Sequence, residues 1–258
     1  MHADNFQLDT YLARIGHTGP VAATLATLSA LMRQQLFTVP FENLDVQAGK
    51  GVSLVPEHIV SKILGDQRGG YCYEVNGLFA MALQAIGLPY RMVAARPMFY
   101  PARRPKTHMA LVVQAEGAEW LCDLGFGSYG IRAPMSLSEL DVPVAQHPDT
   151  FRLSRNAVGE YLLQALVQGE WANQYGFDLS PCEWVDFMPA NWMNSTHPDA
   201  IFVQKRVVVR HHPEGRDILL GDALKTVRGS EVLQRTLAEA EIAPVLRDTF
   251  GLVAPAAA

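Results

Sequence analysis

Cysteine is scarce in this sequence, and its three copies, Cys72, Cys122 and Cys182, lie far apart. An odd number of cysteines without a Cys-x-x-Cys pair argues against both a disulfide framework and a zinc knuckle. We therefore expect no metal site. Sparse, unpaired cysteines are typical of proteins in a reducing compartment.

The chain also lacks the features that direct a protein into a membrane or out of the cell. Its first five residues, MHADN, have neither the basic block nor the apolar block of a signal peptide. No apolar run approaches the length of a membrane span. We expect a cytoplasmic protein without a membrane partner.

Positive charge is in deficit as well. The 258 residues include 21 Lys and Arg against 26 Asp and Glu, a formal net charge of −5. Binding to nucleic acid through overall charge is therefore not expected, although a local basic patch stays open. With 49% hydrophobic residues, the chain has the composition and length to bury a core.

What the sequence does contain is a helical first part followed by strands. Residues 9–37 and 56–64 have the apolar spacing of helices. After Pro89 the period becomes that of strands without intervening helices, which is typical of a barrel or sandwich. The expected strands are residues 91–99, 108–114, 119–126, 150–154, 161–168 and 171–177. In the tail, the same patterns predict strands at residues 201–210 and 217–220 and a helix at residues 230–242.

The segment RGGYCYEVNGLF, residues 68–79, places a cysteine where a glycine-rich turn should become a helix. Apolar residues from Val75 to Ile86 follow one helix face, which predicts a helix that ends near Gly87. Cys72 then lies in the first turn, where the partial positive charge of the helix N-terminus favours a thiolate. The segment alone leaves two interpretations open, a nucleophile or a buried structural cysteine.

A cysteine nucleophile needs a base, and the base needs a group that orients it. Among eight histidines, His108 alone opens a strongly apolar segment, THMALVV. A half-buried sheet histidine without a catalytic role fits that segment too. Asp123 lies in another apolar segment, where an unpaired carboxylate would be costly to bury. Asp123 could orient His108, cap a turn or pair with an arginine.

The spacing makes a geometric prediction about these two residues. A two-residue turn at Glu116-Gly117 would pair the flanking alanines and place Asp123 opposite Ala110. His108 and Ala110 point to the same face, so Asp123 would be diagonal to His108, roughly 7–8 Å away along the backbone. A register shifted by one residue would send the two side chains to opposite faces.

With these residues identified, the sequence resembles the arylamine N-acetyltransferase family, in its bacterial form. The segments that carry the resemblance are RGGYCYEVN at 68–76, THM at 107–109, DLGFG at 123–127, PFENLD at 40–45, residues 191–202 and TFGL at 249–252. The resemblance spans most of the chain and is weakest at residues 137–185. It implies a catalytic triad of Cys72, His108 and Asp123.

The resemblance also implies an α+β fold with a cysteine-protease-like core. Residues 1–90 would form an N-terminal helical bundle that carries the cysteine. Residues 91–190 would form a β-barrel domain that carries the histidine and aspartate, and residues 191–258 an α/β lid.

The implied reaction is ping-pong acetyl transfer from acetyl-CoA, as a co-substrate, to the nitrogen of an arylamine, arylhydrazine or N-hydroxyarylamine. No tightly bound cofactor is implied. We expect Glu42 and Arg68 to form a pair that braces the turn before Cys72. We expect Arg103 and Arg104 to attract the CoA phosphates; the alternative is that they belong to an ordinary solvated basic loop. The residues expected to line the substrate cleft are Phe41, Phe126, Gly127, Ser128, Tyr129 and Phe202. The alternative for each aromatic residue among them is a purely structural place in the core.

Other functions use the same residue types. A papain-like or transglutaminase-like hydrolase needs an equivalent triad, and an amide synthase of the same family would act on a polyketide or other acyl thioester. A non-catalytic binding protein would leave Cys72 unreactive.

Overall fold

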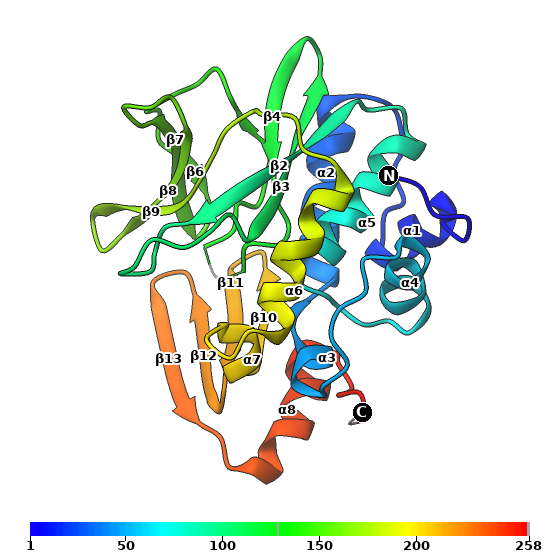
Figure 1. Cartoon of the computed structure of the whole chain (residues 1–258), viewed down its shortest axis with the longest axis vertical. Coiled ribbons are helices and arrows are strands. Elements are labelled where there is room, and N and C mark those ends of the chain that lie inside the picture. Colours follow the sequence, from blue (N-terminus) through cyan, green and yellow to red (C-terminus); the bar gives the residue numbers. More distant parts are fainter. Residues whose placement is uncertain (128, 257–258) are drawn as a thin grey trace.

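The structure is a computed structural model that describes residues 1–127 and 129–256 (Figure 1). Helices of the N-terminal part pack beside a large curled sheet, and a second sheet with a C-terminal helix lies below both (Figure 1). The mixture of helix and sheet agrees with the predicted fold class. None of the described helices is long and apolar enough to cross a membrane.

The N-terminal part is built around one central helix, α5. Every residue from Cys72 to Leu83 in this helix is buried. A helix with small and apolar residues on all of its faces is typical of the centre of a core. The polar Glu74 and Asn76 are buried with them, so each requires a partner. The elements of this part are α1 (Leu8–Ile15), α2 (Leu25–Thr38), β1 (Phe41–Glu42), α3 (Leu44–Gln47), α4 (Pro56–Val60), the π-turn η1 (Ser61–Gly65) and α5 (Cys72–Ala85).

The large sheet is an antiparallel half-barrel of eight strands in the order β5-β4-β3-β2-β9-β8-β7-β6. Strand β3 lies against α5 and is buried along nearly its whole length. The sheet stays open, since β5 and β6 do not pair within the described part of the chain. Its strands are β2 (Tyr90–Pro97), β3 (His108–Ala115), β4 (Ala118–Cys122), β5 (Met135–Ser136), β6 (Val144–Gln146), β7 (Asp149–Arg155), β8 (Tyr161–Val167) and β9 (Glu170–Phe177).

The β3–β4 hairpin has the predicted register. Glu116 and Gly117 both have positive φ, 52° and 77°, which suits a two-residue turn whose twist matches the strands. Ala115 pairs with Ala118, as the sequence predicted. The ladder ends at Cys122, so residues 123–126, expected to continue the strand, form a loop instead.

The second sheet has the order β1-β10-β11-β12-β13, so a strand from the N-terminal part forms one of its edges. Helix α8 packs on this sheet through a separate apolar cluster. Strand β1 pairs with β10 and also forms a bridge from Phe41 to Gly70, so the second sheet is connected to the turn that precedes Cys72. The domain boundaries at residues 90 and 190 stay a prediction. The elements here are η2 (Trp184–Phe187), α6 (Met188–Thr196), α7 (Ile201–Gln204), β10 (Val207–His212), β11 (Gly215–Leu220), β12 (Ala223–Arg228), β13 (Glu231–Thr236) and α8 (Glu239–Phe250).

Two predictions for the tail were wrong. Residues 230–242 are the exposed edge strand β13 followed by the start of α8, because a turn at Gly229 pairs Glu231 with Arg228. Val232 and Leu233 have helical spacing with Leu237 but are both exposed. Residues 201–210, expected as one strand, begin with the short helix α7.

Candidate active site

Cys72 is the first residue of α5 and is almost entirely buried. The preceding Tyr71 is extended, and its backbone N–H donates to the Glu74 carboxylate at 3.0 Å, which caps the helix. Gly69 lets this turn pass close to the N-terminal segment, since a Cβ there would lie 2.0 Å from the Pro40 carbonyl oxygen. The sequence thus fixes the cysteine at a helix start, as predicted.

A cluster of five charged side chains braces the turn. Arg68 Nη2 lies 2.7 Å from Glu42 Oε1, so the predicted Glu42–Arg68 pair does form. Lys62 Nζ contacts both Asp45 Oδ2 and Glu74 Oε1 at 2.7 Å. Burial disfavours the Lys62 ammonium, but the surrounding carboxylates outweigh it and raise the pKa of Lys62. Three carboxylates therefore share two cations beneath the cysteine turn.

Replacing Lys62 with methionine should destabilise the protein. The substitution keeps most of the buried stem but leaves three carboxylates facing one guanidinium, so we expect a loss of ~3–5 kcal/mol in the free energy of unfolding. Urea unfolding measures this loss. The control is Lys50→Met at an exposed position, which should change stability by less than ~0.5 kcal/mol. Equal, small effects of both substitutions would show that the cluster does not stabilise the turn.

His108 begins β3, and its Nε2 lies 2.7 Å from Asp123 Oδ2. The two side chains meet as the hairpin register predicted. Burial opposes charge on the imidazole, but the Asp123 carboxylate, helped by the Cys72 thiol, raises the pKa of His108 to about 10. Below that pH both ring nitrogens carry a proton and the ring is positively charged. The rings of Tyr175 and Phe126 lie 5.0 Å and 5.1 Å from the imidazole, centroid to centroid, and shield it from water.

Asn76 holds Asp123 in place, a role that the sequence reasoning missed. Its Nδ2 donates to Asp123 Oδ1 at 3.0 Å and to the Met109 carbonyl at 2.8 Å, and its Oδ1 accepts from the Leu124 N–H. The available signal was its position, one helical turn after Cys72 on the same face. Because the Gly125 N–H also donates to Asp123 Oδ1, the buried carboxylate is satisfied at both oxygens.

Gly125 allows the loop after Asp123 to touch helix α5 at Cys72. A Cβ at this position would lie 2.5 Å from the Cys72 Cα. A second missed contact holds the next part of this loop: His211 Nε2 lies 2.9 Å from the Gly127 carbonyl oxygen. Burial, together with Arg132 and Arg216, lowers the pKa of His211 to about 3, so the neutral ring donates to that carbonyl.

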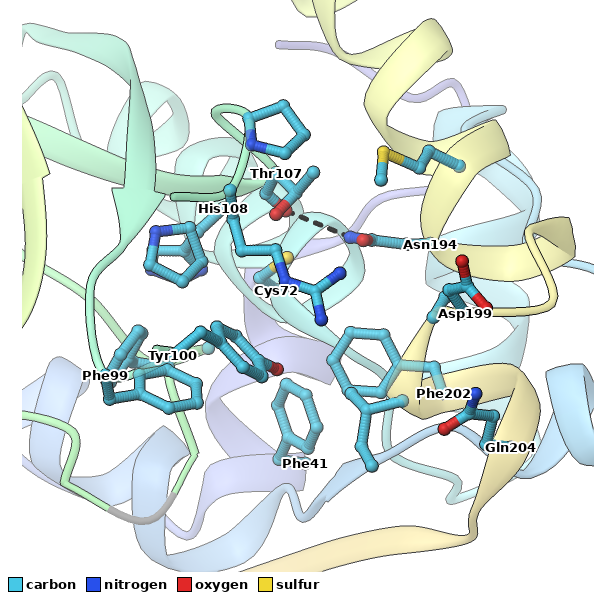
Figure 2. Close-up of a pocket in the computed structure, with 18 residues that line it drawn as sticks. Phe41, Cys72, Phe99, Tyr100, Thr107, His108, Asn194, Asp199, Phe202 and Gln204 are labelled. Atoms are coloured by element: carbon cyan, nitrogen blue, oxygen red, sulfur yellow. Dashed lines mark hydrogen bonds between the residues drawn. The ribbon is translucent and has the colours of Figure 1, made fainter. Parts of the chain in front are cut away.

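Cys72 and His108 face a cavity of about 300 Å³ between the half-barrel and α6–α7 (Figure 2). Asn194 of α6 closes one side by donating to the Thr107 carbonyl at 2.9 Å, next to His108 (Figure 2). Of the predicted cleft residues, the following line this cavity together with the cysteine and histidine: Phe41, Phe126, Phe202 and Arg104.

The remaining predicted residues lie elsewhere. Gly127 and Tyr129 line an adjoining apolar cavity. Arg103 is exposed and lines a separate surface depression, although it is next to Arg104 in sequence. Ser128 lies outside the described residues. No group of three potential metal ligands occurs in the described ranges, and all three cysteines are free.

The sequence of this chain is similar to that of a known class of enzymes. A family model described as N-acetyltransferase matches residues 24–257, nearly the whole chain. The arylamine N-acetyltransferase of Escherichia coli strain K12 is 32% identical over 250 residues, which cover 95% of this chain and 88% of that protein.

Solved structures agree with the sequence match. The arylamine N-acetyltransferase from Mycobacterium abscessus has a TM-score of 0.91 at 33% identity, covering 98% of this chain and 92% of that one. The Mycobacterium marinum enzyme in complex with CoA has a TM-score of 0.89 at 31% identity, covering 95% and 92%. The chain therefore belongs to the arylamine N-acetyltransferase family, as its motifs predicted.

Proposed function

We propose that this enzyme transfers an acetyl group from acetyl-CoA to the nitrogen of an arylamine, arylhydrazine or N-hydroxyarylamine, with Cys72, His108 and Asp123 as the catalytic triad. The observation that carries the proposal is that three elements bring these side chains together, with Cys72 and His108 lining one cavity and Asp123 buried behind the histidine. A helix-start cysteine lies beside a buried histidine, whose ring is held by an aspartate at 2.7 Å. The related enzyme's complex with CoA supports a CoA thioester as donor.

The first half-reaction forms an acetyl-cysteine. The Cys72 thiolate attacks the thioester carbonyl, and the CoA sulfur leaves and takes a proton from the His108 imidazolium. The Glu74 N–H already donates to the Tyr71 carbonyl, so the Cys72 and Tyr73 N–H groups that precede it in α5 are the ones that can stabilise the oxyanion. In the second half-reaction the amine attacks the acetyl-cysteine, and His108 accepts the proton that the amine loses.

Asp123 keeps His108 in the tautomer and orientation that these two proton transfers require. Its Oδ2 contacts His108 Nε2, which leaves Nδ1 for the thiol. The aromatic walls of the cavity, Phe41, Phe126 and Phe202, suit the ring of an arylamine. The same rings exclude water, which protects the acetyl-cysteine from hydrolysis.

Arg104 is the better candidate of the two arginines for attracting the CoA phosphates. It lines the cavity and its guanidinium lies 4.7 Å from the centroid of the Tyr100 ring. We expect Arg104→Ala to raise the acetyl-CoA KM about 5-fold at low ionic strength, the equivalent of ~1 kcal/mol for a partly exposed charge. The increase should shrink as salt rises.

Two variants control this measurement. Arg104→Lys keeps the charge and should restore most of the affinity, whereas Arg103→Ala, at the exposed neighbour, should change KM by less than about 2-fold. Initial rates across a series of acetyl-CoA and salt concentrations measure all three variants. If Arg103→Ala had the larger effect, the donor phosphates would bind at the outer depression instead.

A steady-state experiment tests the proposed reaction. With acetyl-CoA and a simple aniline as substrates, chromatography should detect the N-acetyl product, and reciprocal plots at several fixed amine concentrations should be parallel. A papain-like or transglutaminase-like hydrolase would instead release CoA at the same rate without amine. That outcome, or intersecting plots, would contradict the proposal.

A further inference from the structure

We propose that a second cavity, which adjoins the first, binds the tail of acyl groups longer than acetyl, so that the enzyme also transfers medium-length straight acyl chains from thioesters. This inference rests on the proposed function, because it assigns a location to the acyl group that Cys72 would carry. It concerns a space of about 580 Å³, larger than the cavity that contains the cysteine.

The two cavities adjoin each other along one shared wall. Six residues line both: Phe41, Phe99, Tyr100, Phe126, Ile201 and Phe202. Cys72 and His108 line only the first cavity. Figure 2 shows Phe41, Phe99, Tyr100 and Phe202 gathered on the side of the first cavity away from Thr107. An acyl chain on Cys72 that extends past Phe126 would enter the second space between these rings.

The walls of the second cavity come from both sheets. Val167 and Ala172 belong to β8 and β9 of the half-barrel, and Val209 and Ile218 belong to β10 and β11 of the second sheet. Among the described residues that line it, none is charged. The polar Gln174 already donates to the Ala172 carbonyl at 3.0 Å. Such a lining favours a hydrocarbon chain and disfavours the phosphates of CoA.

The reaction order explains why the acyl group is the expected occupant. In double displacement the CoA must leave and the amine must enter through the first cavity, while the acyl group stays on Cys72 throughout. A tail that filled the first cavity would obstruct this exchange. A separate apolar space keeps the tail aside in both half-reactions. An acceptor ring, by contrast, fits against the aromatic walls of the first cavity.

The chemistry is unchanged by chain length. The Cys72 sulfur forms a bond to the acyl carbon as the bond from that carbon to the donor sulfur breaks, and His108 protonates the leaving thiolate. The amine nitrogen then bonds to the acyl carbon, the Cys72 sulfur leaves, and the amine proton passes to His108. No oxidant, reductant or metal is required.

Single-turnover acylation with acyl-CoAs from acetyl to octanoyl tests the proposal. Burial can favour each added methylene by up to ~4-fold, so we expect hexanoyl-CoA to acylate the enzyme at least ~10-fold more efficiently than acetyl-CoA. Thioesters of N-acetylcysteamine, which lack the nucleotide, should give the same order of preference. A steady fall in efficiency from acetyl onward, with either donor, would overturn the proposal.

Filling the second cavity should remove the preference. Ala172→Phe should lower the ratio of hexanoyl to acetyl efficiency at least ~10-fold, and Ile218→Trp, from the opposite wall, should do the same if the first variant fails to fold. The control Ala145→Phe makes the same change at an exposed position of β6 and should leave the ratio unchanged.

The outcomes separate this inference from the proposed function. Loss of activity toward bulky amines alone in Ala172→Phe, with an unchanged acyl ratio, would assign the cavity to the acceptor and overturn the inference. Failure of every thioester to acylate Cys72 would instead refute the proposed function itself. Normal acetyl transfer with no gain from longer chains would refute only the inference.

Discussion

Acetyl transfer should fall by at least ~10⁴-fold when Cys72 is replaced by alanine, because the covalent route then has no nucleophile. Residual activity would come only from binding both substrates close together. The side chain removed is small and next to the cavity, so the fold should persist. Chromatographic detection of the acetylated amine measures the loss, and circular dichroism checks the fold.

The control for this substitution is Cys182→Ala. Cys182 is partly exposed and lines neither of the two adjoining cavities. Its replacement should leave the rate within about 2-fold of the original, as expected for a surface change. An active Cys72→Ala enzyme would remove Cys72 from the mechanism, whatever its surroundings look like.

Asp123→Asn should lower kcat by roughly 10³- to 10⁴-fold while it preserves the fold. The amide oxygen can replace Asp123 Oδ1, which accepts from Asn76 and from the Gly125 N–H. The amide NH₂ would then face His108 Nε2 and donate to it. This places the remaining ring proton on Nδ1, so the ring can no longer accept a proton from Cys72. Asp141→Asn, at an exposed position, is the control.

The same substitution should shift the dependence on pH. The carboxylate raises the pKa of His108 to about 10, so the imidazolium persists across neutral pH and is lost as pH rises through that value. The stabilisation from this pair is complete below the ordinary histidine pKa of about 6.5 and disappears above about 10. In Asp123→Asn both the residual acylation rate and the stability should therefore decline at a lower pH. An unchanged alkaline limit would show that His108 does not control it.

Local sequence patterns predicted the elements that carry Cys72, His108 and Asp123, because a single local feature determines where each element begins or pairs. The helix period and the glycine turn fixed the start of α5, and Glu116-Gly117 fixed the register that joins His108 to Asp123. Successive strands predicted a barrel or a sandwich. That the described sheet is an open half-barrel, with β5 and β6 as its edges, depends on contacts between residues far apart in the chain.

The features that escaped prediction all depend on tertiary contacts. Val232 and Leu233 have the spacing of a helix face, but their segment pairs with β12 and forms the edge strand β13. Nothing local connects His211 with the Gly127 carbonyl 84 residues away. The second cavity forms only where two sheets face each other, so no single segment encodes it.

The most direct test of the proposed mechanism is the intact mass of the unmodified enzyme after brief mixing with acetyl-CoA, followed by addition of an arylamine. Double displacement through Cys72 predicts a gain of one acetyl group, located on the peptide that contains Cys72, and its complete loss when the amine is added. The absence of an adduct, an adduct on another residue, or an adduct that survives the amine would contradict it.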